Sequence, residues 1–238
     1  ESIIGMVAGY VLWLFLSSLT TPDVIGIAST VVSLSVIFSQ ILDIHVSVGS
    51  IPFLGKSFSE GKLEDVKLLV EACLLIAFSG ILIGSLFITI FRQWLFPAFG
   101  NQLIIILILL IGSTIIFNLL RSVLISALKT KSLPKIAIIS SAFRIGLALS
   151  LLLLGLGATG ITLGYLVGFA VACVLLSIIV VTNLAGVKKQ ATINLFPACK
   201  RILAASIPSW IPTVMLVIGS HLGTVVVFSA YGPGQAAS

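Results

Sequence analysis

Residues 145–187 read IGLALSLLLLGLGATGITLGYLVGFAVACVLLSIIVVTNLAGV and contain no Asp, Glu, Lys or Arg. A helix of about 20 apolar residues crosses the hydrocarbon core of a bilayer, so this run is long enough for two crossings. Its centre, residues 155–160, reads GLGATG, and such a glycine cluster favours a tight turn. The run therefore predicts two transmembrane helices, at 136–155 and 160–182, joined by a short hairpin.

The composition of the whole chain also indicates a membrane protein. Of its 238 residues, 59% are hydrophobic and 8% are charged, and the mean hydropathy is +1.29. Soluble domains carry about 25% charged residues, so this chain has too few charges to cover a surface that faces water. A soluble enzyme, a nucleic-acid-binding domain and a disordered protein are therefore excluded.

The remaining uncharged runs give further helices. In lipid the backbone polar groups cannot bond to water, and a helix satisfies them internally. We therefore predict an all-α fold, a polytopic transmembrane helical bundle. Its expected helices are 3–20, 24–48, 67–91, 102–128, 136–155, 160–182 and 204–229.

The basic residues predict the orientation of this bundle. The loops after the second, fourth and sixth helices carry ten of them: Lys56, Lys62, Lys67, Lys129, Lys131, Lys135, Lys188, Lys189, Lys200 and Arg201. The opposite loops carry Arg92, within an aromatic segment at 91–99 that suits the outer headgroup layer. Because cytoplasmic loops are enriched in Lys and Arg, we expect a multi-pass protein of the cell membrane with a cytoplasmic N-terminus.

Two expected outer loops share a pattern of proline and small residues. Residues 21–28 read TPDVIGIA after the first helix, and residues 231–238 read YGPGQAAS after the seventh. Six helices separate them, which suggests two parallel six-helix lobes with the second cut off after its first helix. The expected domains are a six-helix transmembrane lobe at 1–183, a basic amphipathic cytoplasmic linker at 184–203, and the first helix of a second lobe at 204–238.

Five stretches, in order along nearly the whole chain, resemble a known family. They are TPDVIGIAS at 21–29, QILDIH at 40–45, GKSFSEGK at 55–62, GLGATGITLGYL at 155–166 and SIPSW at 206–210. The chain resembles the polysaccharide (O-antigen, Wzx-type) flippases of the multidrug/oligosaccharidyl-lipid/polysaccharide exporter superfamily. The resemblance implies a fragment of a transporter with twelve to fourteen helices in two lobes around a central cavity. Ile44 and His45 stand where the family usually has a glycine after the aspartate of the second helix.

Three of the expected helices carry polar residues at three- and four-residue spacing, which places them on one helical face. They are Ser29, Ser33, Gln40, Asp43, Ser47 and Ser50 on the second helix, Thr114, Asn118, Arg121, Ser122 and Ser126 on the fourth, and Ser140, Ser141 and Arg144 on the fifth. Three such faces can line one watery cavity. At 1.5 Å per residue, Arg121 lies about 10 Å and Arg144 about 12 Å from the cytoplasmic ends of their helices.

Two interpretations of these residues stay open. An ionisable residue at a helix centre costs about 2.5–3.5 kcal/mol, which favours a functional role. Two guanidiniums at similar depth could hold a diphosphate through bidentate hydrogen bonds, with Asp43 and Glu71 holding them when no lipid is bound. Equally, these groups could form structural ion pairs, or the arginines could extend to the inner interface. The candidate substrate-binding residues are Arg121, Arg144, Asn118, Gln40 and Asp43.

Two further features concern the sixth and seventh helices. His221 is a candidate for ion or proton coupling, and its alternative role is that of a hydrogen-bonded packing residue. Gly160, Gly164 and Gly168 form a stripe that suits close helix packing, which we expect within the bundle. The sequence predicts no catalytic residue, no metal site and no cofactor, and the spacing of its three cysteines fits neither a metal site nor a disulfide.

The leading prediction is a flippase that moves a lipid-diphosphate-linked oligosaccharide across the membrane by alternating access, for export of cell-surface polysaccharide. Its expected partners are a polyprenyl-diphosphate-linked oligosaccharide, membrane lipids and the missing C-terminal lobe. One alternative is a cation-coupled small-molecule (multidrug-type) exporter of the same superfamily, which a deep acidic residue in the first helix would favour; residues 2–22 carry no charge. The other alternative is a membrane enzyme acting on lipid-linked sugars, which would need a nucleophile–base pair or a metal cluster.

Overall fold

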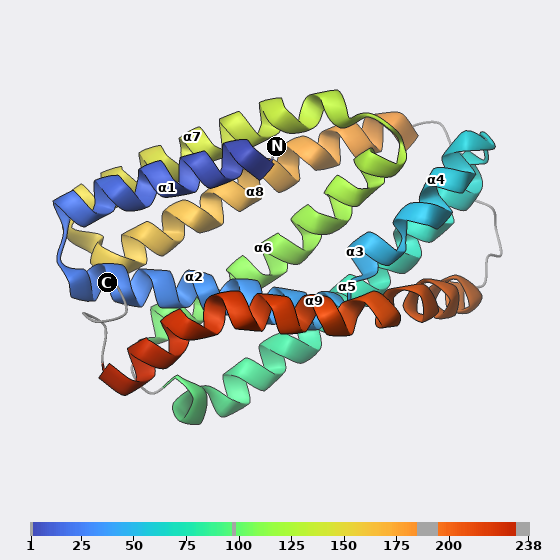
Figure 1. Cartoon of the computed structure of the whole chain (residues 1–238). Helices are drawn as coiled ribbons and strands as arrows, with labels where there is room; N and C mark the ends of the chain where they lie inside the picture. Colours follow the sequence, from blue (N-terminus) through green and yellow to red (C-terminus); the bar gives the residue numbers. More distant parts are fainter. Residues whose placement is uncertain (1, 97–98, 185–194, 232–238) are drawn as a thin grey trace.

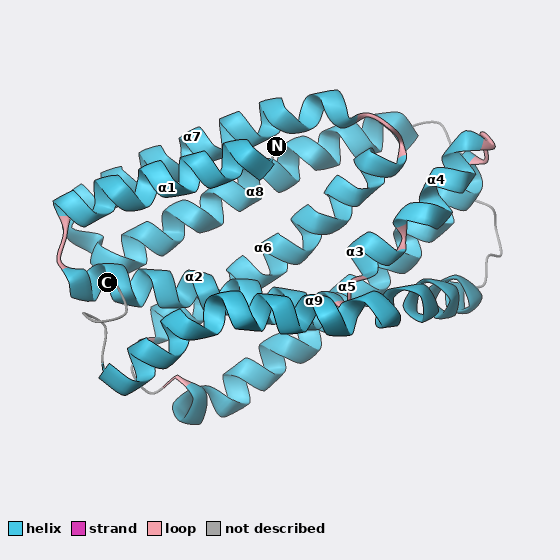
Figure 2. Cartoon of the chain, viewed as in Figure 1, coloured by secondary structure: helices cyan, strands magenta, loops and turns pink. Residues whose placement is uncertain are grey.

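The computed structural model of the chain describes residues 2–96, 99–184 and 195–231, and the regular structure in these ranges is helical throughout (Figure 1, Figure 2). The long helices are α1 (Ser2–Leu19), α2 (Pro22–Asp43), α5 (Leu63–Leu95), α6 (Asn101–Ser126), α7 (Leu133–Leu151), α8 (Gly157–Leu184) and α9 (Leu195–Tyr231). Two short helices, α3 (Val46–Gly49) and α4 (Ile51–Ser59), connect α2 to α5. The predicted all-helical fold is confirmed.

The predicted number of membrane passes agrees with the observed helices. Five continuous helical stretches are long and apolar enough to cross a membrane, and α1 contributes a shorter apolar helix at Ile4–Leu19. One of the five, Thr130–Leu184, reverses direction between α7 and α8 and therefore supplies two antiparallel apolar helices. The described part of the chain thus holds seven apolar helices in the predicted order.

The reversal between α7 and α8 lies in the predicted glycine cluster. A single turn of π-helix (Leu152–Leu156) ends α7, and Gly155 (φ 85°) and Gly157 (φ 54°) take up left-handed backbone angles that glycine adopts without strain. The two helices then run back side by side (Figure 1). A Cβ atom on Gly164 would lie 2.6 Å from Cβ of Ala148, so the backbones are in direct contact. The expected close-packing face within the bundle is confirmed.

The second helix was expected at 24–48, and its predicted C-terminal end is wrong. α2 stops at Asp43, because Ile44 (φ 47°) and His45 (φ 58°) both adopt the left-handed conformation, and the chain resumes as α3. Partial burial of His45 beside this break lowers the pKa of its imidazole. The break lets α3 and α4 fold back against α6.

The seventh helix also differs from its expected bounds. α9 begins at Leu195, nine residues before the expected start, and continues through Pro208 and Pro212. Residues 185–194, the first half of the expected linker, lie outside the described ranges. α9 packs on α2 and α3: the indole of Trp210 donates to the Gln40 carbonyl oxygen at 3.1 Å, and a Cβ on Gly49 would lie 2.9 Å from Cα of Ser206.

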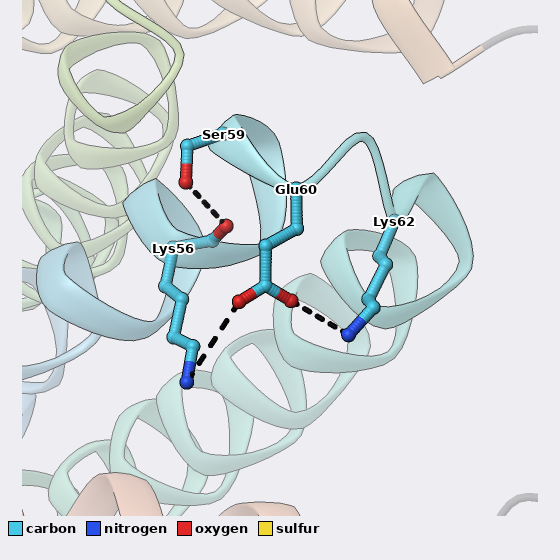
Figure 3. A network of polar contacts seen from close by, with 4 residues as sticks. All are labelled: Lys56, Ser59, Glu60 and Lys62. Carbon is cyan, nitrogen blue, oxygen red and sulfur yellow. Dashed lines mark hydrogen bonds and ion pairs between the residues drawn. The ribbon is translucent and has the colours of Figure 1, made fainter.

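The turn from α4 into α5 carries a small network of charges (Figure 3). Nζ of Lys62 lies 2.6 Å from one Glu60 oxygen, and Nζ of Lys56 lies 3.8 Å from the other. The hydrogen bond from Lys62 lowers the pKa of Glu60. These side chains are exposed to solvent, so the network contributes little stability. The predicted basic loop is therefore an ordered, charged tip at one end of the bundle.

α6 forms the centre of the bundle. It packs against α8 on one side and against α2 and α5 on the other, and its apolar side chains are among the most buried of the described residues. Figure 1 shows α1, α7 and α8 gathered above α6, and α2, α5 and α9 below it.

Candidate functional site

A cavity of about 560 Å³ lies between the two helix groups. That size is within the range of small-ligand pockets, about 300–1,000 Å³. Its polar lining comes from three helices: Arg121 of α6, Ser140, Ser141 and Arg144 of α7, and His221 of α9, with apolar residues of α1, α2 and α8 between them. The structure therefore brings the two predicted arginines and the predicted histidine to one cavity.

Arg144 reaches the cavity from the middle of α7. That helix starts at Leu133 with Pro134 in its first turn, a position where proline is tolerated because no helical bond is lost. Ser140 and Ser141 precede Arg144 by four and three residues, so the three share one helical face, as predicted. All three line the cavity.

The guanidinium of Arg144 is only partly satisfied. Its Nε and Nη2 atoms are buried and have no hydrogen-bond partner among the described residues. Its Cζ atom lies 5.0 Å from the ring centroid of Tyr165 on α8, a cation–π contact. A buried cation with unused donors is costly unless an anion meets it. The arrangement therefore suits an anionic ligand in the cavity.

Arg121 is half-buried on α6 and lines the same cavity. The carboxylate expected to hold the arginines, Asp43, lies elsewhere. It is 2% exposed at the end of α2, one of its oxygens accepts a 2.6 Å hydrogen bond from Ser47, and the other oxygen has no partner among the described residues. The hydrogen bond that the structure describes for the Asp43 carboxylate is therefore with Ser47 of α3.

The remaining predicted binding residues are also placed away from the cavity lining. Gln40 is half-buried on α2, where its backbone carbonyl accepts the Trp210 hydrogen bond. Asn118 is half-buried on α6, one turn before Arg121, and is not among the residues that line the cavity. From α2 the lining takes Val36 instead. The role of Gln40, Asn118 and Asp43 in substrate binding therefore stays a prediction.

Several hydroxyl groups of α2 find their acceptors within their own helix. Ser29 and Thr30 both donate to the Gly26 carbonyl oxygen, at 3.1 and 2.7 Å, and Ser39 donates to that of Val36 at 2.9 Å. A hydroxyl bonded to the preceding turn of its own helix needs no water. These residues can therefore pack against neighbouring helices.

The sequence did not indicate the aromatic residues around the cavity. Phe117 of α6 and Phe169 of α8 line it and meet edge to face, with ring centroids 5.6 Å apart. Tyr165 lies beneath Arg144. These residues stand in uniformly apolar helices, where an aromatic side chain gives no periodic signal. The one available signal was the position of Tyr165 three residues before Gly168, on the predicted close-packing face.

A second, smaller cavity of about 280 Å³ lies where α5 ends and α6 begins. Arg92 donates to the Asn101 side-chain oxygen at 2.8 Å there, and the rings of Phe96 and Phe99 stack with centroids 5.7 Å apart. These residues belong to the predicted outer aromatic segment, of which 97 and 98 lie outside the described ranges. Among the described residues, no group of three or more His, Cys, Asp or Glu side chains could hold a metal ion.

The fold and the cavity define a polytopic helical bundle with a central cationic cavity. No protein-family model and no curated protein matches the chain. A solved structure, described as the inward-facing conformation of a multidrug resistance MATE family transporter of the MOP superfamily, matches with a TM-score of 0.64 and 16% identity. The match covers 100% of this chain and 56% of that transporter. The chain therefore has the fold of little more than half of a MATE transporter.

Proposed function

We propose that this chain is the first lobe, with the first helix of the second lobe, of a flippase for lipid-diphosphate-linked oligosaccharide in the superfamily of that transporter. In this proposal the protein lies in the cell membrane with its N-terminus in the cytoplasm. The main supporting observation is that Arg144 has unpaired, buried N–H groups at a cavity that Arg121 also lines.

The chemistry of this cavity fits a phosphate-bearing ligand. Guanidinium groups present forked N–H donors that match phosphate oxygens, and they keep their charge at any physiological pH. Ser141 adds a hydroxyl group on the same wall, while the hydroxyl of Ser140 donates to the Ala137 carbonyl oxygen at 3.2 Å. A diphosphate bound here would satisfy the unused donors of Arg144, while a lipid chain could remain in the bilayer.

His221 is the proposed ion- or proton-coupling residue. It is half-buried and reaches the cavity from α9, whereas the arginines belong to α6 and α7. In the proposal α9 belongs to the second lobe. A motion between lobes would therefore change the distance between the histidine and the bound anion, which is what coupling requires.

The test is transport by the complete protein reconstituted in vesicles with a polyprenyl-diphosphate-linked oligosaccharide. A hydrogen bond to a charged group contributes about 1.5–3 kcal/mol, so Arg144→Gln should slow flipping by about 10- to 150-fold. Arg144→Lys should retain part of the activity, because it keeps the charge and loses the fork. The matched control is Lys131→Gln, an exposed residue that is not among those that line the cavity. Equal rates for Arg144→Gln and this control would refute the proposal.

A second candidate function is export of small molecules. It is favoured by the description of the similar solved structure as a multidrug resistance transporter. A cavity with two arginines would select anionic compounds and repel cationic ones. Export of small anions by the reconstituted protein, with no flipping of the lipid-linked oligosaccharide, would favour this candidate over the first.

A further inference from the structure

We propose that Tyr165 is a positioning residue for Arg144. Its buried ring holds the guanidinium through a cation–π contact, which leaves the N–H groups free to bind a phosphate-type ligand. The inference rests on the proposed function and deepens it, because it concerns the group that would bind the anion. Tyr165 itself is not among the residues that line the cavity. Its role would therefore be exerted through Arg144.

The contact between the two side chains is close and buried. Cζ of Arg144 lies 5.0 Å from the centroid of the Tyr165 ring, and Tyr165 is 5% exposed. The same ring also meets Trp13 of α1, with centroids 6.0 Å apart and an angle of 36° between the planes. Tyr165 is thus fixed by a second aromatic side chain and has little freedom to move away from Arg144.

The base of the Arg144 side chain is fixed by the same helix. A Cβ on Gly168 would lie 2.8 Å from Cβ of Arg144 and 3.1 Å from the Ser140 carbonyl oxygen, so the α8 backbone touches the start of the side chain. Tyr165 and Gly168 are three residues apart and share one face of α8. α8 therefore contacts Arg144 at both ends, at Cβ and at the guanidinium.

The kind of group that contacts the Arg144 guanidinium determines how many of its hydrogen-bond donors remain available to a ligand. A carboxylate would stabilise the guanidinium by accepting its hydrogen bonds, which would occupy the donors. An aromatic ring attracts the cation through its quadrupole and accepts none of the in-plane N–H groups. The ring thus explains how Nε and Nη2 can stay buried without a partner among the described residues. The arrangement holds a charged donor ready for an anion.

The experiment measures binding of inorganic diphosphate to the complete protein that contains this chain, purified in detergent. Cation–π contacts contribute about 0.5–2 kcal/mol, so Tyr165→Leu should weaken binding by about 2- to 30-fold. Tyr165→Phe keeps a ring and should bind within about 2-fold of the original chain. The control is Tyr10→Leu, the same change at a residue of α1 that is 71% exposed. Thermal unfolding of each variant identifies any that fail to fold.

A double variant separates positioning from a general structural effect. If Tyr165 acts through Arg144, then Tyr165→Leu should cause no further loss in an Arg144→Gln background. An equal loss in both backgrounds would overturn the proposal. So would a Tyr165→Phe variant that binds as weakly as Tyr165→Leu, because the hydroxyl and not the ring face would then be required.

A second measurement needs no ligand. The Nε–H resonance of Arg144, assigned by its loss in Arg144→Gln, should lie upfield because of the ring current of Tyr165. It should move downfield in Tyr165→Leu and stay in place in Tyr165→Phe. If the original chain binds no diphosphate, the proposed function fails, while this resonance still decides the positioning role. If Tyr165→Leu leaves the Nε–H resonance of Arg144 unchanged, the positioning role of Tyr165 is refuted.

Discussion

Replacement of Gly164 by alanine tests how closely α7 and α8 must approach for the cavity to form. The added Cβ would lie 2.6 Å from both Cβ and the backbone nitrogen of Ala148. Carbon atoms in ordinary contact are about 3.5–4.0 Å apart, so α7 must withdraw by about 1 Å. Arg144 lies one turn before Ala148 on α7 and would be displaced with it.

The size of the effect follows from two opposing contributions. Overpacking of this kind lowers the free energy of unfolding by about 1–3 kcal/mol. Replacing a helical glycine by alanine raises it by about 1 kcal/mol. The matched control is Gly146→Ala on the facing helix α7, where nothing lies within 4 Å of the added Cβ. The control should therefore stabilise the chain by about 0.5–1 kcal/mol. The difference between the two variants, about 1–3 kcal/mol, is the cost of separating the helices.

The assay is thermal unfolding of both variants in the same detergent, with diphosphate binding as a second readout. For chains of this size 1 kcal/mol corresponds to about 2–4 °C in Tm, so Gly164→Ala should unfold at least about 2 °C below Gly146→Ala. Its diphosphate affinity should also fall, because Arg144 is displaced. Two variants of equal Tm and equal affinity would refute the reasoning.

Two further predictions concern a helix end and the orientation of the bundle. Leu128 lies two residues after the end of α6, has φ 56° and is 88% exposed, so Leu128→Gly should remove left-handed strain with little loss of packing. Leu128→Gly should stabilise the chain by about 0.5–1 kcal/mol, whereas Leu128→Val should unfold at a lower temperature than the original chain. A Leu128→Val variant that unfolds at a higher temperature than Leu128→Gly would contradict this reasoning. Single cysteines at Lys62 and Lys131 should be shielded from an impermeant thiol reagent in intact cells, because both loops are expected in the cytoplasm. Labelling of both from outside would invert the predicted orientation.

The helices were predictable because lipid imposes a simple rule on the sequence. A span needs an uncharged run of sufficient length, and the hairpin at Gly155 needs residues that tolerate positive φ. The break after Asp43 gave no such signal, because Ile44 and His45 are neither glycine nor proline and apolar residues continue beyond them. The only indication was the glycine usual at that point in the flippase family that the sequence resembles.

The candidate site was predictable only where charge identifies a residue. Arg121 and Arg144 were expected at similar depth on consecutive helices, and they line one cavity. Asp43 and Gln40 were assigned to the same cavity from helical spacing, which does not determine how a helix is rotated about its axis. Tyr165 was not predicted because its contribution depends on the approach of α8 to α7, and that approach is a property of the packed bundle.

The serine and threonine hydroxyls that bond within their own helices have a consequence for motion. Ser29 and Thr30 on α2, and likewise Ser85 and Ser122 on α5 and α6, donate to carbonyl oxygens of the preceding turn. Such a hydroxyl requires no acceptor on the next helix, so the neighbouring surfaces adhere there through dispersion, which has no preferred direction. Two surfaces of this kind can slip along each other by part of a turn and re-form equivalent contacts. The hydroxyl groups of these helices therefore do not fix one helix to the next, and they leave interfaces along which the helices can slide.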